Sequence, residues 1–418
     1  MAVNNFTLIV IGQVISLLGS AMLRFALNLY VLDITGRADI FAAVIAISSI
    51  PAIIFSPIGG AIADRFNRRN LMVIFDFSSS AIVLLLILLM GTGTIPVAAI
   101  GAILTILAII SSMYQPAVQA SVPTLVSGDQ LAGANGIVSG VGALAGLLGP
   151  VLGGVMYGFI GLKILVIISC IAFFLSAVME IFIRIPFTKR TSDKRIIGTI
   201  LNDVKDGFLY IAKKKTIILK VVSVAAVLNL ILTPLFIIGT PYILRVAMKS
   251  TDIQYGIGLG ILQLSAIVGA LSTGVFAKKL RISKLHIPII AIALLLLPMA
   301  FAVTPAFLEL GYMPSFALFF LFTFAAFFIL TLVSVFVVTD IQKMTPNEML
   351  GKVLATMMAV SQIAAPLGQA LYGALFQILN DRLYVPLLFA SVFTAVIALG
   401  ARKLLRQEQP AVGHQTSD

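Results

Sequence analysis

Long runs of apolar residues, separated by short polar segments, fill most of the chain. Runs of about 20 apolar residues cross the hydrocarbon core of a bilayer as helices. These runs are continuous and do not alternate with polar residues, which favours helices over a membrane barrel. The first run is also too long for a cleavable signal peptide. We expect twelve transmembrane helices, at residues 6–33, 40–62, 71–91, 96–119, 131–159, 164–183, 217–246, 255–277, 287–304, 315–341, 352–378 and 383–401.

The longest polar interruption divides these helices into two sets of six. Within it, apolar residues recur at helical spacing at Ile196, Ile200, Val204, Phe208 and Ile211. That spacing predicts an amphipathic helix lying at the membrane surface. The sequence therefore predicts an all-α membrane protein of four parts: an N-terminal six-helix bundle (1–183), a linker (184–216), a C-terminal six-helix bundle (217–401) and a tail (402–418).

Composition agrees with a membrane protein. Hydrophobic residues make up 60% of the 418 residues, charged residues make up 11%, and the mean hydropathy is +1.12. A net charge of +12 could indicate nucleic acid, but with alternating loops 22 of the 28 Lys and Arg residues fall on one side. Cytoplasmic loops carry such an excess. We expect a cell inner or plasma membrane protein with both termini in the cytoplasm, basic loops beside anionic lipid and no nucleic acid partner.

Residue types needed for catalysis or metal binding are few. The two histidines, His286 and His414, lie in polar segments, and the single cysteine, Cys170, lies within an expected helix. One cysteine excludes an internal disulfide, and no spacing suits a metal or phosphate site. We therefore expect no enzymatic activity, no metal and no cofactor.

A compact charged turn stands between the second and third expected helices, from Gly60 to Arg69. Asp64 follows the carboxyl end of an apolar helix, whose dipole disfavours a negative charge there. Another group must stabilise it, either Arg65 or the amino end of another helix. Asn67 tolerates the left-handed conformation common at helix ends, so a tight turn is expected. The basic residues of the turn are Arg65, Arg68 and Arg69.

The two halves carry weakly matching segments. The pairs are Gln119–Pro123 with Gln342–Pro346, and Pro150 and Gly153 with Pro366 and Gly368. Two parallel six-helix halves around a central site are one architecture of secondary transporters.

The charged turn has the spacing Gly-x-x-x-Asp-Arg-x-x-Arg-Arg, and Asn67 stands where glycine is usual. In this it resembles the loop between helices 2 and 3 of the major facilitator superfamily. The first half is most similar to the drug/proton antiporters of macrolide-efflux and siderophore-exporter type. The residues that carry this likeness are Gly12-Gln13, Ser16–Gly19, Ala26–Tyr30, Thr35-Gly36, Pro51, Val122-Pro123, Leu125-Val126 and Ala134-Asn135.

This resemblance implies a monomeric transporter that exports amphipathic organic compounds by alternating access, driven by the proton gradient. Small-molecule substrate, protons and membrane lipids are then its partners. Two residues common in that family are absent: the fourth helix has no arginine, and Ser20 stands where Asp is common. A lipid or lysophospholipid translocator and an uptake transporter share the architecture and are alternatives.

The resemblance also implies residues for a conformational switch. Asp64 and Arg65 would latch the cytoplasmic side, together with Gly60, Arg68 and Arg69. Gly149, Pro150 and Gly153 are similar to the antiporter motif of helix 5. Small residues there let two helices approach closely, and Pro150 bends the helix, so we expect this seam to face the other half. Simple helix packing is the alternative.

In the resembling family, helices 1, 4, 7 and 10 line a central cavity. Each of these spans here carries a polar stripe, and polar groups facing lipid would cost several kcal/mol each. The residues expected to bind substrate are Arg24, Asn28, Ser20, Gln115, Asn229, Thr233 and Ser334. The alternative is that these side chains join helices by hydrogen bonds. Arg24 is the sharpest candidate, because no acid of matching depth is evident.

Four acids lie at or within spans. We expect Asp340 and Asp33 to be candidates for proton coupling. Glu180 and Arg184 are spaced as a structural pair one helical turn apart. Asp76 stands near the charged turn, so we expect it to pair with an arginine there and to belong to the switch.

Overall fold

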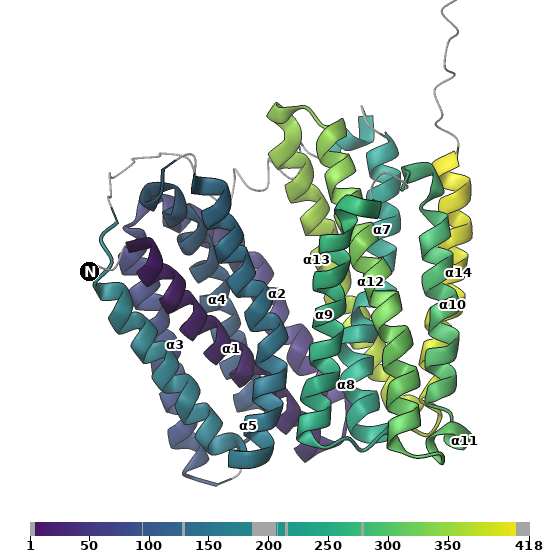
Figure 1. Ribbon diagram of the computed structural model, residues 1–418, viewed down its shortest axis with the longest axis horizontal. Helices are drawn as coiled ribbons and strands as arrows, with labels where there is room; N and C mark the ends of the chain where they lie inside the picture. Colours follow the sequence, from purple (N-terminus) through teal and green to yellow (C-terminus); the bar gives the residue numbers. More distant parts are fainter. Residues whose placement is uncertain are drawn as a thin grey trace, which may run out of the picture.

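The computed structural model describes residues 5–93, 95–127, 130–185, 206, 208–213, 216–276 and 280–406, apart from the side chains at 64, 132, 347, 348, 355, 358 and 361–363. Long helices dominate the described residues (Figure 1). The first five are α1 (Asn5–Thr35), α2 (Ala38–Arg65), α3 (Arg68–Met90), α4 (Val97–Leu125) and α5 (Leu131–Ile181).

The second half begins with a helix whose hydrogen bonding changes along its length. It consists of α7 (Thr216–Pro234), η2 (Leu235–Gly239), α8 (Thr240–Tyr242) and η3 (Ile243–Ala247). The two η segments are wider π-type turns, and each follows a proline, Pro234 or Pro241, which lacks a backbone donor. The remaining elements are α9 (Asp252–Phe276), η4 (Ile282–Lys284), α10 (His286–Ala302), α11 (Pro305–Leu308), α12 (Tyr312–Met344), α13 (Asn347–Ile378), η5 (Asn380–Arg382) and α14 (Tyr384–Arg406).

The expected all-α membrane fold is confirmed. Within the described residues, ten helices are long and apolar enough to cross a membrane. One of them, α5, holds two expected spans, because Gly161 has φ of 75° and breaks the helix between them. Glycine adopts this conformation without steric cost. The helix α13 corresponds to the eleventh expected span.

The structure bears on two further segments, the expected linker and the expected tail. The amphipathic linker helix falls mostly on residues 186–205, 207 and 214–215, which lie outside the described residues, whereas Phe208 and Ile211 are helical. The last helix, α14, continues to Arg406, into the first residues of the expected tail.

The helices pack as two groups. In the N-terminal bundle, α1 and α3 pack on α5, and α2 and α3 pack on α4. In the C-terminal bundle, α10 packs on α12 and α14, α9 packs on α12, and α7 packs on α13 and α14. The main contacts between the bundles are those of α5 with α9 and of α2 with α13.

Both bundles present one end to each side of the molecule. We call the side where α1 begins and α14 ends the terminal face, and the side that carries residues 36–37, Gly161 and 248–251 the distal face. The terminal face is at the top of Figure 1, where the two bundles separate, and the distal face is at the bottom, where they meet. The shared hydrophobic core agrees: Phe25, Leu29, Leu32, Phe41 and Ala42 join the C-terminal core, and all lie in the distal halves of α1 and α2.

Candidate functional site

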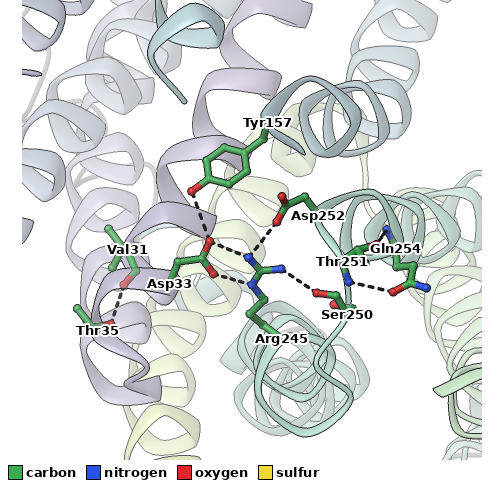
Figure 2. A network of polar contacts seen from close by, with 9 residues as sticks. All are labelled: Val31, Asp33, Thr35, Tyr157, Arg245, Ser250, Thr251, Asp252 and Gln254. Carbon is green, nitrogen blue, oxygen red and sulfur yellow. Dashed lines mark hydrogen bonds and ion pairs between the residues drawn. The ribbon is translucent and has the colours of Figure 1, made fainter. Parts of the chain in front are cut away.

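A polar network joins the two bundles at the distal face (Figure 2). Arg245, in η3, donates from Nε to Asp33 Oδ1 at 2.6 Å and from Nη2 to Asp33 Oδ2 at 2.8 Å. Its Nη2 also lies 2.9 Å from Asp252 Oδ1, at the start of α9. Tyr157, in α5, donates to Asp33 Oδ2 at 3.4 Å. We call Asp33, Arg245, Asp252 and Tyr157 the distal clamp.

Local structure holds Arg245 in place. Its Nη1 donates to the carbonyl of Ser250 at 2.7 Å. Lys249 has φ of 52°, so the chain reverses direction after η3 and α9 begins beside the guanidinium. Arg245 and Asp33 each retain 23% of their side-chain exposure, so solvent screens this ion pair less than a fully exposed one. The geometry is a bidentate arginine–carboxylate pair, which is among the stronger polar contacts.

Close helix packing accompanies the clamp. A Cβ added at Gly154, in α5, would lie 2.5 Å from the carbonyl oxygen of Asp252 and 3.0 Å from Cα of Gly256, in α9. A Cβ added at Gly256 would lie 2.5 Å from the carbonyl oxygen of Pro150. On the opposite edge, Gly373 of α13 packs against Ala42 of α2. The distal halves of the bundles are therefore in backbone contact.

Gly149, Pro150 and Gly153 of α5 were expected to face the other bundle, and this is only partly correct. Gly149 and Gly153 face α1 within their own bundle, where they contact Ala21 and Phe25 respectively. Pro150 and Gly154 are the residues that face the other bundle. One helix face therefore serves the internal packing of the bundle, and the adjacent face serves the contact between bundles.

The terminal halves of the same helices are apart. A Cβ added at Gly133, Gly136, Gly140 or Gly142, in the terminal half of α5, would meet no atom within 4 Å, and neither would one at Gly274, near the end of α9. The bundles are thus closed at the distal face and open at the terminal face.

The charged turn lies at the terminal face and differs from expectation. Asn67 has φ of −63°, not a left-handed value, and its side chain accepts a hydrogen bond from the Arg69 amide at 3.0 Å. It is the N-cap of α3. Arg68 donates to the carbonyl of Ala63 at 3.2 Å, and Arg69 donates to that of Ile183 at 3.3 Å, tying the turn to α2 and to the end of α5. A Cβ at Gly60 would be free of contact. The expected Asp64 latch depends on a side chain outside the described set.

Comparison with known proteins identifies the family. The family model described as Major Facilitator Superfamily matches residues 9–369. The chain belongs to the Major Facilitator Superfamily. Members of that superfamily are membrane transporters and not enzymes.

Relatives are distant. The chain is 25% identical over 175 residues to macrolide efflux protein A of Streptococcus pyogenes, which covers 42% of this chain and 43% of that protein. It is 25% identical over 219 residues to the uncharacterized transporter YkuC of Bacillus subtilis, which covers 51% of this chain and 50% of that protein. The chain therefore matches only about half the length of these curated relatives.

Solved structures share the fold over nearly the whole chain. The nucleoside transporter NupG has a TM-score of 0.75 at 14% identity, covering 97% of this chain and all of that chain. A bacterial homologue of the iron transporter ferroportin, in an inward-facing state, has a TM-score of 0.69 at 16% identity, covering 96% of this chain and 99% of that chain. At these identities the likeness concerns the fold alone.

In this superfamily member, the residues expected to bind substrate are spread over four helices. Among the described residues, the one hydrogen bond between two of the seven runs from Thr233 Oγ1 to Asn229 Oδ1, at 2.9 Å. Ser20 is buried beside Asp76, Gln115 is half-buried and Ser334 is exposed.

Arg24 and Asn28 lie on one face of α1. At about 100° per residue, Arg24 stands between Ala21 and Phe25, which contact α5, and Leu27, which packs in the N-terminal core. The Arg24 side chain is exposed and has no hydrogen bond or ion pair within the described part of the chain. Asn28 Oδ1 is buried without a hydrogen-bond partner.

Two buried acids have partners other than those expected from the sequence. Asp76 accepts a hydrogen bond from Ser16 at 2.9 Å and pairs with no arginine of the turn. Glu180 accepts one from Tyr114 at 2.7 Å, and the expected pair with Arg184 is wrong, because Glu180 is fully buried and forms no ion pair with Arg184 in the described residues. Asp340 is half-buried in α12 and Asp33 belongs to the clamp.

The sequence patterns did not single out Arg245 and Asp252. Arg245 fell at the end of the expected span 217–246, and Asp252 fell before the span that begins at 255. The signal that could have found them is their clustering, because Arg245, Lys249 and Asp252 lie within eight residues at a short distal turn.

Proposed function

We propose that this transporter exports amphipathic organic compounds across a cell inner or plasma membrane by alternating access, driven by protons, as a monomer. The observation that carries the proposal is the asymmetry between the two faces. A bidentate ion pair and glycine contacts close the distal face, while glycines on the terminal halves have open space around them. This arrangement is what one end state of a rocking cycle requires.

The terminal face is assigned to the cytoplasm in this proposal. The excess of Lys and Arg in the loops of that side supports the assignment. The conformation is then inward-facing, with the extracellular side closed by the distal clamp. In the opposite state the clamp opens, and the charged turn with Gly60, Asp64 and Arg65 closes the cytoplasmic side.

The proposed substrate contacts lie on α1, α4, α7 and α12. Arg24 and Asn28 support them best, because both carry polar atoms without a partner on the same face of α1. An unpaired guanidinium at this depth is costly unless water or a ligand meets it. Arg24 would bind an anionic or strongly polar group of the substrate, and Ser20, Gln115, Asn229, Thr233 and Ser334 would serve the rest of the pocket.

Export as the direction, and organic compounds as the cargo, are supported by the similarity to macrolide efflux protein A. For proton coupling, the sequence candidates Asp340 and Asp33 differ in their surroundings. Asp33 is held in an ion pair by Arg245. Asp340 has no ion pair within the described residues and stays a candidate.

The test is transport by purified protein in liposomes. A fluorescent amphipathic dye and a radiolabelled macrolide are each offered with and without an imposed pH gradient. We expect gradient-dependent transport of at least one of them, and weaker transport by Arg24→Ala than by Arg24→Lys. Transport that ignores the gradient would contradict proton coupling, and normal transport of every compound by Arg24→Ala would contradict its role in binding.

A second set of liposomes distinguishes the alternatives. Fluorescent lysophospholipid is placed in one leaflet, and its movement to the other is measured by dithionite quenching. Lipid movement without dye or macrolide transport would overturn the proposed export function in favour of lipid translocation. Substrate accumulation only toward the terminal face would instead indicate uptake.

A further inference from the structure

Two buried carboxyl groups lie close enough to interact electrostatically inside the N-terminal bundle, away from the distal clamp. Asp76, in α3, is 2% exposed, and Glu180, near the end of α5, is fully buried. Ser16 of α1 donates to Asp76 Oδ1 at 2.9 Å, and Tyr114 of α4 donates to Glu180 Oε1 at 2.7 Å. Three other elements thus surround the Asp76 carboxyl, and each supplies a polar side chain or a carboxyl.

One oxygen of each carboxyl is left without a partner. Asp76 Oδ2 and Glu180 Oε2 are buried and accept or donate no hydrogen bond. The Ser176 hydroxyl donates to the carbonyl of Gly12 at 3.0 Å, next to Glu180. Buried polar atoms in native proteins are nearly always paired, so two orphans of the same kind in one cluster need an explanation.

No positive charge compensates the pair within the described residues. Among these residues neither carboxyl has a basic nitrogen within ion-pair distance, and the Ser176 hydroxyl is a further hydrogen-bonding group beside Asp76. The other titratable and charged groups on the elements packed around the pair are Arg24, Tyr30 and Asp33 on α1, Arg68 and Arg69 at the start of α3, Tyr114 on α4, and Tyr157, Lys163 and Cys170 on α5.

Two ionised carboxylates in such a place would be very costly. A buried charge without a partner costs several kcal/mol, and two neighbouring negative charges repel each other in addition. A proton on one oxygen removes a charge and turns an orphan acceptor into a donor. Two such carboxyls exchange protons as one unit.

A small cavity lies between Asp76 and α1. Its volume is about 20 Å³. Its polar lining is Asp76, Ser16, Ser20, Ser79, Ser111 and Tyr114, and its apolar lining is Leu17, Leu107, Ile110 and Phe173. A cavity of roughly 10–15 Å³ or more with polar walls holds a water molecule. Ser20 lies one helical turn from Arg24, so the cavity points toward the α1 face that carries the proposed substrate contacts.

We propose that Asp76 and Glu180 together bind the proton that drives transport, a role the sequence had assigned to Asp340 and Asp33. This proposal rests on the proposed proton-coupled export. The proton is held while the pair is buried, as in this conformation, and it leaves when α1 moves relative to α3 and α5 and water reaches the carboxyls. Because Ser16 and Ser20 lie on the helix that carries Arg24, substrate binding and proton release act on the same element.

The test uses Asp76→Asn, Glu180→Gln and the double variant in liposomes. Asp381→Asn is the matched control, since it removes an exposed carboxyl. Two transport modes are measured with the same compound: accumulation driven by a pH gradient, and exchange across the membrane without any gradient. We expect the Asp76 and Glu180 variants to lose gradient-driven accumulation and to keep exchange. Unimpaired gradient-driven accumulation in both single variants would overturn the proposal.

Infrared spectroscopy of the wild-type protein tests the pair without transport. We expect a carbonyl band of a protonated carboxyl that disappears as the pH is raised, and that is missing in the double variant but present in Asp381→Asn. The absence of a titrating band in the wild type would overturn the proposal even if transport is proton-driven. A titrating band in a protein that transports none of the tested compounds would refute the export function and leave proton binding by the pair standing.

Discussion

Asn67 illustrates how a single side chain sets the geometry of the charged turn. It caps α3 through the Arg69 amide, and Arg68 binds the carbonyl of Ala63 near the end of α2. These two contacts satisfy backbone groups that every helix leaves unpaired at its ends. The turn is therefore held by capping and not by a left-handed residue.

Replacing Asn67 tests this directly. We expect Asn67→Ala to lower the free energy of unfolding by about 1 kcal/mol, and Asn67→Gly to lower it by only a few tenths. Asn67→Asp should keep the cap. The measurement is thermal or denaturant unfolding of the purified protein in detergent. If Asn67→Gly were more stable than the wild type, a left-handed conformation would be favoured instead, contrary to the structure.

The sequence could identify buried acids within the spans, but it could not identify their hydrogen-bond partners. It marked Asp76 and Glu180 as acids within spans, yet assigned them to arginines nearby in the sequence. Their actual partners, Ser16 and Tyr114, are 60 and 66 residues away. Spacing along one helix reports such contacts only when both groups lie on the same element.

At the scale of elements, α5 has two packing faces with different roles. Gly149 and Gly153 pack on α1 of the same bundle, whereas Pro150 and Gly154 pack on α9 of the other. Small residues allow this because helices in lipid gain stability from close backbone approach. The apolar runs predicted the helices well. The small residues of α5, however, are adjacent in the sequence, so the sequence could not show which of them pack on α1 and which pack on α9.

Gly154→Ala should weaken the contact between the bundles. Its Cβ would lie 2.5 Å from the Asp252 carbonyl oxygen, so the backbones must separate, at a cost of about 1–3 kcal/mol to the distally closed state. Gly142→Ala is the matched control in the same helix, because a Cβ there meets no atom within 4 Å.

The readout is the labelling rate of a cysteine introduced as Ala42→Cys, in a background that carries Cys170→Ser. Ala42 is 1% exposed and packs against Gly373, so a maleimide reaches it when the distal face opens. We expect faster labelling with Gly154→Ala than with Gly142→Ala. Equal rates in the two variants would mean that the α5–α9 contact does not hold the distal face closed.

At the scale of the whole molecule, the chain is two bundles that meet at one face and part at the other (Figure 1). The six-and-six layout could be expected from the hydrophobic runs and the long polar interruption. The distal clamp could not, because Asp33 and Arg245 are 212 residues apart and belong to different bundles. Only the packing of the bundles brings these charges together.

In the proposed cycle, the clamp stabilises the distally closed conformation. Hydrogen bonds between charged groups contribute about 1.5–3 kcal/mol each at most. Losing one such contribution shifts a two-state population by roughly ten- to a hundredfold. Arg245→Gln should therefore move a measurable fraction of molecules to the opposite state. Arg37→Gln serves as the control, because the ion pair of Arg37 with Asp39 lies on the same face but within one bundle.

The most direct test is a distance across the terminal face, measured between spin labels at Gly133→Cys and Gly274→Cys by pulsed electron resonance. Both positions have open space around them. We predict one dominant long distance in the otherwise unaltered protein and with Arg37→Gln, and an additional shorter distance with Arg245→Gln, as the terminal halves close. A distribution that Arg245→Gln leaves unchanged would contradict the claim that the distal clamp controls alternating access.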